Sequence, residues 1–230
     1  MAIEFGVSNR ADGNMLVAIG DELFPLGQEN RRRFLNRQGI ERAVVCRLAH
    51  GTEVKVVTAA DTGTVVWGID ALITREPDLF LALTVADCFP VYFWNEESGV
   101  VAIAHAGWRG VAGGVVSATV AALSSTFAVA PDDLSAAIGP GVRSCHFVVH
   151  HDVASRFANY PSFIVEREDE TYIDLPGIIL AQLGAAGVPE ASIRDSGECT
   201  YCLPDRYFSH RRDHTEPIEA MLAHIGVRGG

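Results

Sequence analysis

The sequence predicts a single α+β domain built on mixed β-sheets. Strand-like and helix-like segments are interleaved along the chain, without the strict strand–helix–strand period of a doubly wound fold. Of the 230 residues, 48% are hydrophobic and 20% are charged, which is typical of a chain that buries a full core without metals or disulfides. No linker, charge block or low-complexity run marks a boundary, so residues 1–230 are interpreted as one domain.

The N-terminal part is expected to combine strands with one helix. Residues 4–16 indicate a strand, a turn and a loop, and the charged segment 27–36 indicates a helix. Residues 41–57 alternate around a central His-Gly pair, which predicts two strands separated at the glycine. The apolar run 78–94 contains a proline, so it predicts a buried strand that loses its regularity near residues 87–90.

The middle of the chain predicts a strand, glycine turn and helix unit. Residues 99–107 are expected to form a second buried strand, and 108–127 a helix, because small and apolar residues recur there at helical spacing. Weaker signals follow in this order: strands over 134–142 and 145–150, a helix over 151–160 opened by Asp152, a hairpin over 163–174, and an amphipathic helix over 175–187 that stops at Gly187. The segment 218–227 is ambiguous between helix and strand.

Charge and cysteine content restrict the class of partner. Lys and Arg number 18 and Asp and Glu number 29, so the net charge of −11 repels the phosphates of nucleic acids and anionic membranes. The N-terminus lacks a signal peptide pattern, and the apolar runs are far shorter than the ~18 residues of a membrane helix. Five sparse cysteines fit a reducing compartment. We expect a cytoplasmic protein that acts on a small molecule, and its oligomeric state is left open.

Three residues could form a catalytic metal centre. His50, Cys88 and His105 each lie beside a glycine or a helix-breaking residue at the end of an apolar segment, where a strand stops and a side chain can face a cleft. Two imidazoles and a thiolate suit zinc, and three protein ligands leave a fourth position for water or substrate. Any one of these residues, taken alone, is more often an ordinary core residue than a metal ligand.

The segment HAGWRGVAGG, residues 105–114, adds further chemistry at a strand-to-helix junction. Its glycines permit close approach of a ligand to the backbone, and Arg109 adds positive charge for an anion. Asp87, immediately before Cys88, could act as a general base or accept a hydrogen bond from a ligand histidine. A carboxylate that caps its own turn is the alternative.

Other cysteine and histidine groupings remain open. Cys199 and Cys202 with His210 and His214 superficially resemble a zinc finger, although the gap between the two pairs is short. Cys145 beside His146 could form an accessory Cys–His pair, but neighbouring residues on a strand point to opposite faces. A blue-copper site would need an axial thioether, and only Met1, Met15 and Met221 are available.

Six stretches of the chain, taken in order, resemble motifs of the YfiH family, whose older name is multicopper polyphenol oxidase or laccase-like. They are LAHGTEV, GIDALIT, TVADCFPVYF, AIAHAGWRGVAGGVV, AAIGPGVRSCHFVV and ECTYCLPDRYFSHRRD. The resemblance implies α/β/β/α layers and a zinc ion held by the histidine of the HG motif, the cysteine of ADC and the histidine of HAGWRG. These are His50, Cys88 and His105. It also leaves copper as a substitute metal.

The resemblance further implies phosphorolysis of adenosine, inosine and methylthioadenosine, with adenosine deamination as a second activity. Purine nucleosides and phosphate would then be the small-molecule partners. Arg31 matches the family's NR motif and is the first candidate for phosphate, and Arg211 with Arg212 forms a second cationic patch. Asp87 would carry protons in the deamination. Where the family often has glutamine this chain has Ala49, and where it has an aromatic residue this chain has His210.

Three alternatives accompany this hypothesis. The first is a zinc amidase that edits serine-containing peptidoglycan precursors, a role that the resemblance also implies. The second is a copper-dependent polyphenol oxidase, as in the family's older name. The third is a zinc-binding protein without enzymatic activity.

Overall fold

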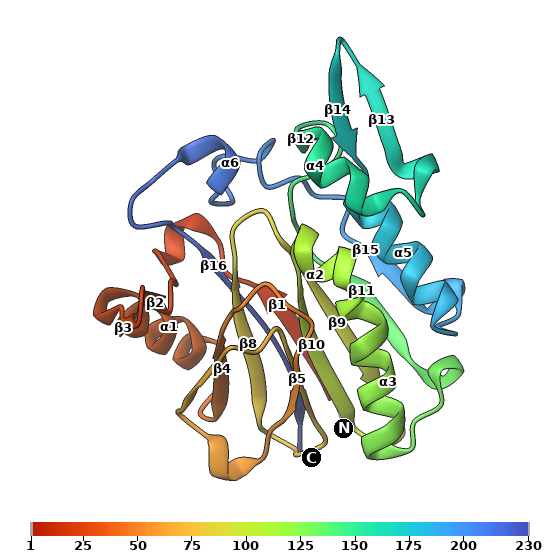
Figure 1. Ribbon diagram of the computed structural model, residues 1–230. Helices are drawn as coiled ribbons and strands as arrows, with labels where there is room; N and C mark the ends of the chain where they lie inside the picture. The colour runs from red at the N-terminus through yellow and green to blue at the C-terminus, as the bar shows by residue number, and fades with distance from the viewer. Residues whose placement is uncertain (1, 230) are drawn as a thin grey trace.

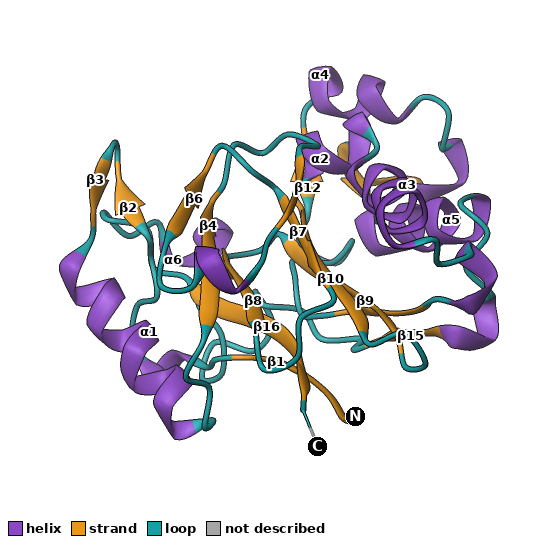
Figure 2. Ribbon diagram, turned by 90° about the horizontal axis from the view of Figure 1, so that it is seen from below, coloured by secondary structure: helices purple, strands orange, loops and turns teal. Residues whose placement is uncertain are grey.

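The computed structural model describes residues 2–229, and two β-sheets packed face to face form its centre (Figure 1). Seen from below, α1 (Pro25–Arg37) covers the outer face of one sheet, and α3 (Val115–Phe127) with α5 (Leu175–Ala185) covers the outer face of the other (Figure 2). Both sheets combine parallel and antiparallel neighbours. The predicted α+β class with mixed sheets in α/β/β/α layers is therefore confirmed.

The first sheet has five strands. In spatial order they are β1 (Ala2–Val7), β16 (Met221–Arg228), β8 (Phe80–Val85), β4 (Ala43–Arg47) and β6 (Val65–Trp67). Along β8, Phe80 and Ala82 pack in the layer of α1, whereas Leu81 and Leu83 pack between the two sheets. The ambiguous segment near the C-terminus is a strand, because β16 pairs with β1 on one side and with β8 on the other.

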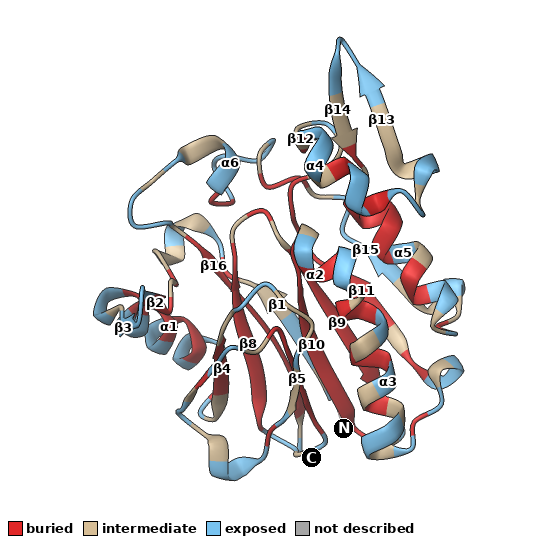
Figure 3. Ribbon diagram, viewed as in Figure 1, coloured by how far each residue is buried: buried red, intermediate tan, exposed pale blue. Residues whose placement is uncertain are grey.

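The second sheet has six strands. In spatial order they are β15 (Ile193–Asp195), β11 (Ser135–Ile138), β9 (Phe89–Asn95), β10 (Val100–Ala106), β7 (Ala71–Thr74) and β5 (Val54–Val56). Val91 and Phe93 share a core with α3 and α5, and Tyr92 packs between the sheets. Figure 3 shows that β8, β9 and β10 are buried along nearly their whole length. These strands form a rigid base for the residues at their ends.

Two long predicted elements are divided in the structure. The apolar run 78–94 is two strands, β8 in the first sheet and β9 in the second, separated by a short turn that contains Asp87 and Cys88. The predicted helix 108–127 is two helices, α2 (Trp108–Gly113) and α3, because Gly114 adopts a left-handed conformation with φ of 88°. Both interruptions lie at the upper end of the sheets in Figure 1.

Short elements surround this upper end. They are the hairpin β2 (Ala18–Ile19) and β3 (Glu22–Leu23), the small sheet of β12 (Val148–Val149), β14 (Glu170–Ile173) and β13 (Ile164–Arg167), and the one-turn helices α4 (His151–Ala154) and α6 (His210–Asp213). Within residues 2–229, six 3-10 helices occupy connections: Arg10–Asp12, Ala59–Asp61, Pro131–Asp133, Ser155–Phe157, Pro161–Phe163 and Glu190–Ser192. None of the helices in this range is long and apolar enough to cross a membrane.

The predictions for residues 145–160 are partly wrong. Residues 144–146 form a turn, because the carbonyl of Arg143 accepts the N–H groups of both His146 and Phe147, and only Val148–Val149 is a strand. The helix that follows starts after His150 rather than at Asp152, and its α-helical part ends at Ala154. The predicted hairpin over 163–174 and the helix stop at Gly187, where φ is 95°, are confirmed.

Candidate metal centre and cleft

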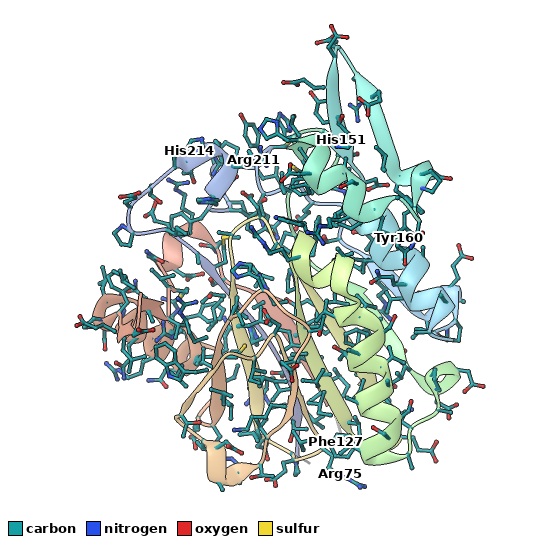
Figure 4. All side chains as sticks on the ribbon, viewed as in Figure 1. Arg75, Phe127, His151, Tyr160, Arg211 and His214 are labelled. Carbon is teal, nitrogen blue, oxygen red and sulfur yellow. The ribbon has the colours of Figure 1, made fainter. Side chains whose placement is uncertain are left out.

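A cleft of about 1280 Å³ opens at the upper end of the two sheets. Its floor contains Cys88 from the turn between β8 and β9 and His105 from β10, and α6 and α4 lie above it in Figure 1. Figure 4 shows Arg211 and His151 at this same end, and Arg75 and Phe127 at the opposite end of the molecule. The cleft therefore lies where the two central sheets end.

The structure brings His50, Cys88 and His105 together in this cleft. One ligand atom of each, two imidazole nitrogens and the Cys88 sulfur, lie within 4.8 Å of one another. The two imidazole rings are nearly perpendicular, with centroids 4.9 Å apart and an interplanar angle of 86°. His105 is buried, whereas His50 is exposed toward the cleft. Three residues from separate parts of the sequence thus present a two-nitrogen, one-sulfur set of donors.

Gly107 leaves the space that a metal ion would need beside these donors. A Cβ atom at this position would lie 2.8 Å from the Cys88 sulfur, 3.3 Å from His105 Cε1 and 3.6 Å from His50 Cδ2. A larger residue would therefore clash with the Cys88 sulfur and press on the His105 ring, while it would only touch His50. The donor set suits zinc or copper, and three ligands leave one coordination position open. The residues present fit a metal ion.

Asp70 supports this centre, and the sequence analysis did not assign it a role. Its side chain is fully buried, and its carboxylate accepts the backbone N–H of His50 at 2.8 Å and of Gly51 at 2.7 Å. The same carboxylate lies 3.2 Å from His105 Nδ1. One buried group therefore fixes both the loop that carries one candidate ligand and the ring of another.

The electrostatics favour an ionised Asp70. Burial raises its pKa, but hydrogen bonds from His105 and from the N–H groups of Gly51 and His50 outweigh this effect and hold the pKa below its usual value. An ionised Asp70 keeps the proton of His105 on Nδ1 and leaves the Nε2 lone pair free for a metal. Burial and the neighbouring His105 lower the pKa of His50, which favours its neutral, metal-binding form.

Metal binding must also displace a proton from His105. Burial lowers the pKa of His105, but the neighbouring Cys88 and the Asp70 carboxylate raise it more strongly, to about 9. A metal cation between His105 and Cys88 would replace that proton. The cation would be stabilised by the same neighbours, Cys88 and the Asp70 carboxylate.

Asp87 lines the cleft but does not contact a ligand histidine. Its carboxylate accepts the Thr200 hydroxyl at 2.6 Å and the Arg211 backbone N–H at 2.7 Å. The interpretation of Asp87 as the hydrogen-bond acceptor of a ligand histidine is therefore wrong, because Asp70 occupies that position. The backbone φ of Asp87 is 81°, which turns the chain sharply before Cys88.

Two exposed arginines lie on the cleft wall, which also contains the half-buried Arg47. Arg109 is exposed, and its guanidinium carbon lies 4.2 Å from the centre of the Trp108 ring. Arg211 is also exposed, and its guanidinium carbon lies 5.8 Å from the centre of the Phe147 ring. Both cations line the same cleft as His50, Cys88 and His105.

Arg31 and Arg212 have structural contacts instead. Arg31 is 5% exposed, lies outside the cleft lining and donates from Nη1 to the carbonyls of Met15 and Leu16. Arg212 donates to the carbonyls of Thr200, Tyr201 and Tyr207 and pairs with Asp213. Their guanidinium groups hold main-chain segments in place. We therefore correct the phosphate-binding interpretation of these two residues to a supporting one.

The zinc-finger grouping is wrong, because the structure assigns Cys199 and Cys202 other neighbours. Their sulfur atoms lie together with Cys145 and a nitrogen of His146, and these four ligand atoms are within 4.8 Å of one another. Cys145 and His146 reach the same side because they lie in a turn rather than on a strand. His210 lies on the cleft wall, and its ring centre is 6.4 Å from that of His214.

The chain is similar to known proteins in sequence and in fold. A family model described as multi-copper polyphenol oxidoreductase laccase matches residues 5–228. The chain is 37% identical to the purine nucleoside phosphorylase YlmD of Geobacillus stearothermophilus over 94% of this chain and 83% of the relative. The crystal structure of YlmD has a TM-score of 0.90, at 33% identity, over 99% of this chain and 92% of that chain.

Two further proteins are similar. The crystal structure of the Bacillus licheniformis hypothetical protein YfiH has a TM-score of 0.89, at 28% identity, over 98% of this chain and 93% of that chain. A protein named adenosine deaminase RL5, from an unknown prokaryotic organism, is 35% identical over 63% of this chain and 57% of the relative.

Proposed function

The chain belongs to the multi-copper polyphenol oxidoreductase laccase family, and from this premise we propose that it is a zinc-dependent purine nucleoside phosphorylase that also deaminates adenosine. The observation that carries the proposal is the His50, Cys88 and His105 cluster on the floor of a cleft whose wall contains two exposed arginines. The names of the relatives, purine nucleoside phosphorylase and adenosine deaminase, support the choice of substrate. The proposal includes a cytoplasmic location, which the cysteine content favours.

The zinc ion would be held by His50, Cys88 and His105. Asp70 would orient the His105 ring through its contact with Nδ1. When bound, zinc supplies Lewis-acid polarisation of an oxygen atom in a reactant. Catalytic zinc sites have three protein ligands and one open position, whereas structural zinc sites have four protein ligands. Two histidines and one cysteine therefore fit a catalytic site.

Arg109 and Arg211 would bind phosphate. The protein carries a net charge of −11, so an inorganic anion needs local cations to enter the cleft. Guanidinium groups suit phosphate because they donate two parallel hydrogen bonds. An anion between these arginines would lie next to the metal centre, where the sugar carbon must be attacked.

The apolar side of the cleft would receive the purine. Phe147, Val149 and Leu175 line it, together with the indole of Trp108. Aromatic rings stack on flat heterocycles, and aliphatic side chains exclude water from the same surface. The purine would thus be held with its sugar directed toward the arginines.

In phosphorolysis, an oxygen of phosphate forms a bond to the anomeric carbon while the bond from that carbon to the purine nitrogen breaks. The electron pair of the broken bond stays with the base, which takes up a proton, and the products are free base and ribose 1-phosphate. Phosphate held by Arg109 and Arg211 would be positioned for this attack. Methylthioadenosine would react in the same way and give methylthioribose 1-phosphate.

In deamination, water adds to C6 of adenine and ammonia leaves. Asp87 would accept a proton from the attacking water and return it to the leaving amine, so that no net proton is gained or lost at the carboxylate. Its contacts with Thr200 and the Arg211 backbone would hold the carboxylate in one orientation. This role does not require phosphate.

Product analysis with three substrates tests the proposal. Purified, zinc-loaded protein should release hypoxanthine from inosine only when phosphate is present, and should convert adenosine to inosine without phosphate. A peptidoglycan precursor that carries serine should stay intact. Release of an amino acid from that precursor, with inosine unchanged, would support the amidase alternative and overturn the proposal. No turnover of any of these substrates by metal-loaded protein would favour a non-enzymatic protein.

A further inference from the structure

A second cluster of soft metal ligands lies outside the cleft lining. It consists of Cys145, His146, Cys199 and Cys202, which come from two loops more than fifty residues apart. The Cys145 sulfur lies 3.6 Å from the Cys199 sulfur and 3.7 Å from the Cys202 sulfur, and the Cys202 sulfur lies 3.3 Å from His146 Nδ1. Three thiols and one imidazole thus converge on one point.

Main-chain contacts join the loop of Cys199 to the loop that leads to Cys145. Gly141 pairs with Cys199 in an isolated parallel bridge, and the Thr200 N–H donates to the Gly141 carbonyl. The two loops are therefore held together by main-chain hydrogen bonds before any ion binds.

The spacing of the sulfur atoms matches a tetrahedral site. With zinc–sulfur bonds of about 2.3 Å, two sulfur ligands of one tetrahedral ion lie about 3.8 Å apart. The two measured separations, 3.6 and 3.7 Å, are close to this value. A disulfide would require a separation of about 2.05 Å, and pairing two of the three cysteines would leave the third thiol unpaired beside His146.

We propose that Cys145, His146, Cys199 and Cys202 bind one zinc ion in a second, structural site. The site is closed, because four protein ligands fill a tetrahedral coordination sphere and leave no position for a substrate. It is separate from the cluster of His50, Cys88 and His105, with which it shares no ligand. This inference is independent of the nucleoside activity proposed above.

The ion would fix one wall of the cleft. Thr200 lies between two ligands of the second site, and its hydroxyl donates to Asp87, the residue that precedes Cys88. The ring of the neighbouring Tyr201 stacks on His146, with centroids 3.9 Å apart. Arg212 ties the same loop to α6 by donating to the carbonyls of Thr200 and Tyr201. The ion would therefore add a further constraint to the loop that contacts Asp87 and the start of α6.

Metal content of matched cysteine variants tests this site without any activity assay. Protein purified under reducing conditions should contain two zinc ions per chain, and Cys199→Ala and Cys88→Ala should each contain one. The double variant should contain none. Cys46→Ala is the control, because Cys46 is buried in β4 and belongs to neither cluster, and it should keep two. Because Cys199 is buried, Cys202→Ala, at an exposed position, gives a second variant that does not disturb packing.

Cobalt substitution identifies the ligands. In the Cys88→Ala background, one Co²⁺ per chain should give the strong visible bands of a tetrahedral site and a thiolate charge-transfer band, and Cys202→Ala should weaken both. The proposal is overturned if wild-type protein contains one metal ion that Cys88→Ala loses. It is also overturned if Cys145, Cys199 and Cys202 all react with a thiol reagent in fully metal-loaded protein, or if two of them form a disulfide in protein kept reduced.

Discussion

The carboxylate of Asp70 lies 3.2 Å from Nδ1 of His105, and both side chains are almost completely buried. The contact joins the loop before β7 to the end of β10, and these two strands are antiparallel neighbours. The carboxylate would fix the tautomer of His105 and leave the other ring nitrogen to serve as a metal ligand in the proposed centre.

Replacing Asp70 by Asn should weaken zinc binding at the first site. The amide keeps the shape of the side chain but removes the charge that supports His105, and loss of such a supporting carboxylate typically costs 10- to 100-fold in metal affinity, as an order-of-magnitude expectation. Competition with a chromophoric chelator measures the affinity. Asp132→Asn, at an exposed position, is the control and should bind zinc like the wild type. An unchanged affinity in Asp70→Asn would show that the carboxylate serves only the fold.

Arg211→Met should impair phosphorolysis through phosphate. The methionine keeps the apolar stem of the side chain but removes a charge-assisted hydrogen bond worth roughly 1.5 to 3 kcal/mol, which is about a 10- to 100-fold rise in the KM for phosphate. Adenosine deamination should change little. Steady-state kinetics with varied phosphate measure both effects, and an equal loss of the two activities would contradict a phosphate-specific role.

Arg31→Met should act on stability instead. Its guanidinium donates to the carbonyls of Met15 and Leu16 from a buried position, so removal leaves two main-chain acceptors without a partner. The midpoint of thermal unfolding should fall by several degrees, and the KM for phosphate in the folded variant should stay near the wild-type value. A stable variant with a strongly raised KM for phosphate would restore the role that the sequence suggests.

The three candidate metal ligands and Arg31 show where the sequence is informative and where it is not. The three candidate ligands could be predicted because each lies in or near the end of an apolar strand, close to a glycine or a proline. In the structure these ends come together in one cleft, where the two central sheets end. Arg31, in contrast, belongs to a run of three arginines on a helix, and only the packing of residues 15–16 against α1 distinguishes it from its neighbours.

Asp70 and the second cluster could not be predicted for a related reason. Nothing near Asp70 in the sequence indicates that its carboxylate accepts N–H groups from His50 and Gly51, since the contact depends on the parallel pairing of β5 with β7. The apolar residues after His146 predict a strand, but the local turn at 144–146 overrides that preference. The CxxC spacing is a visible signal, and only the bridge from Gly141 to Cys199 shows which partner it meets.

His224 should make the fold sensitive to mild acid. Burial between β1, β8 and α1 lowers its pKa to about 4, whereas the ordinary value is 6.5. The unfolded chain therefore binds the proton first as the pH falls, and stability is lost progressively from about pH 6.5 down to pH 4. The total loss is about 3 kcal/mol.

Replacing His224 by Leu isolates this effect. Urea unfolding at several pH values should give the variant a flatter stability profile than the wild type between pH 6.5 and 4. His151→Ala, at an exposed position, should retain the wild-type profile. Parallel profiles for His224→Leu and the wild type would contradict the assignment of the acid sensitivity to this side chain.

Copper loading separates the proposed activity from the polyphenol oxidase alternative. Neither Met15 nor Met221 lines the cleft, and the Met221 sulfur accepts the Phe208 N–H, while Met1 lies outside the described residues. We expect colourless protein as isolated. In the Cys199→Ala background, which removes the second cluster, copper should enter one site per chain, oxidise phenols slowly and lower inosine turnover. Several coppers per chain with rapid phenol oxidation would support the oxidase alternative.

The most direct test of the central claim is phosphorus NMR of inosine turnover by zinc-loaded wild-type protein and by Cys88→Ala. The wild type should convert inorganic phosphate to ribose 1-phosphate in a one-to-one ratio with the hypoxanthine released. Cys88→Ala should retain the fold, as circular dichroism can verify, and lose at least about 100-fold of this activity, or 2.7 kcal/mol of transition-state stabilisation. Ribose 1-phosphate formed by Cys88→Ala at the wild-type rate, or hypoxanthine released by the wild type without consumption of phosphate, would contradict the account.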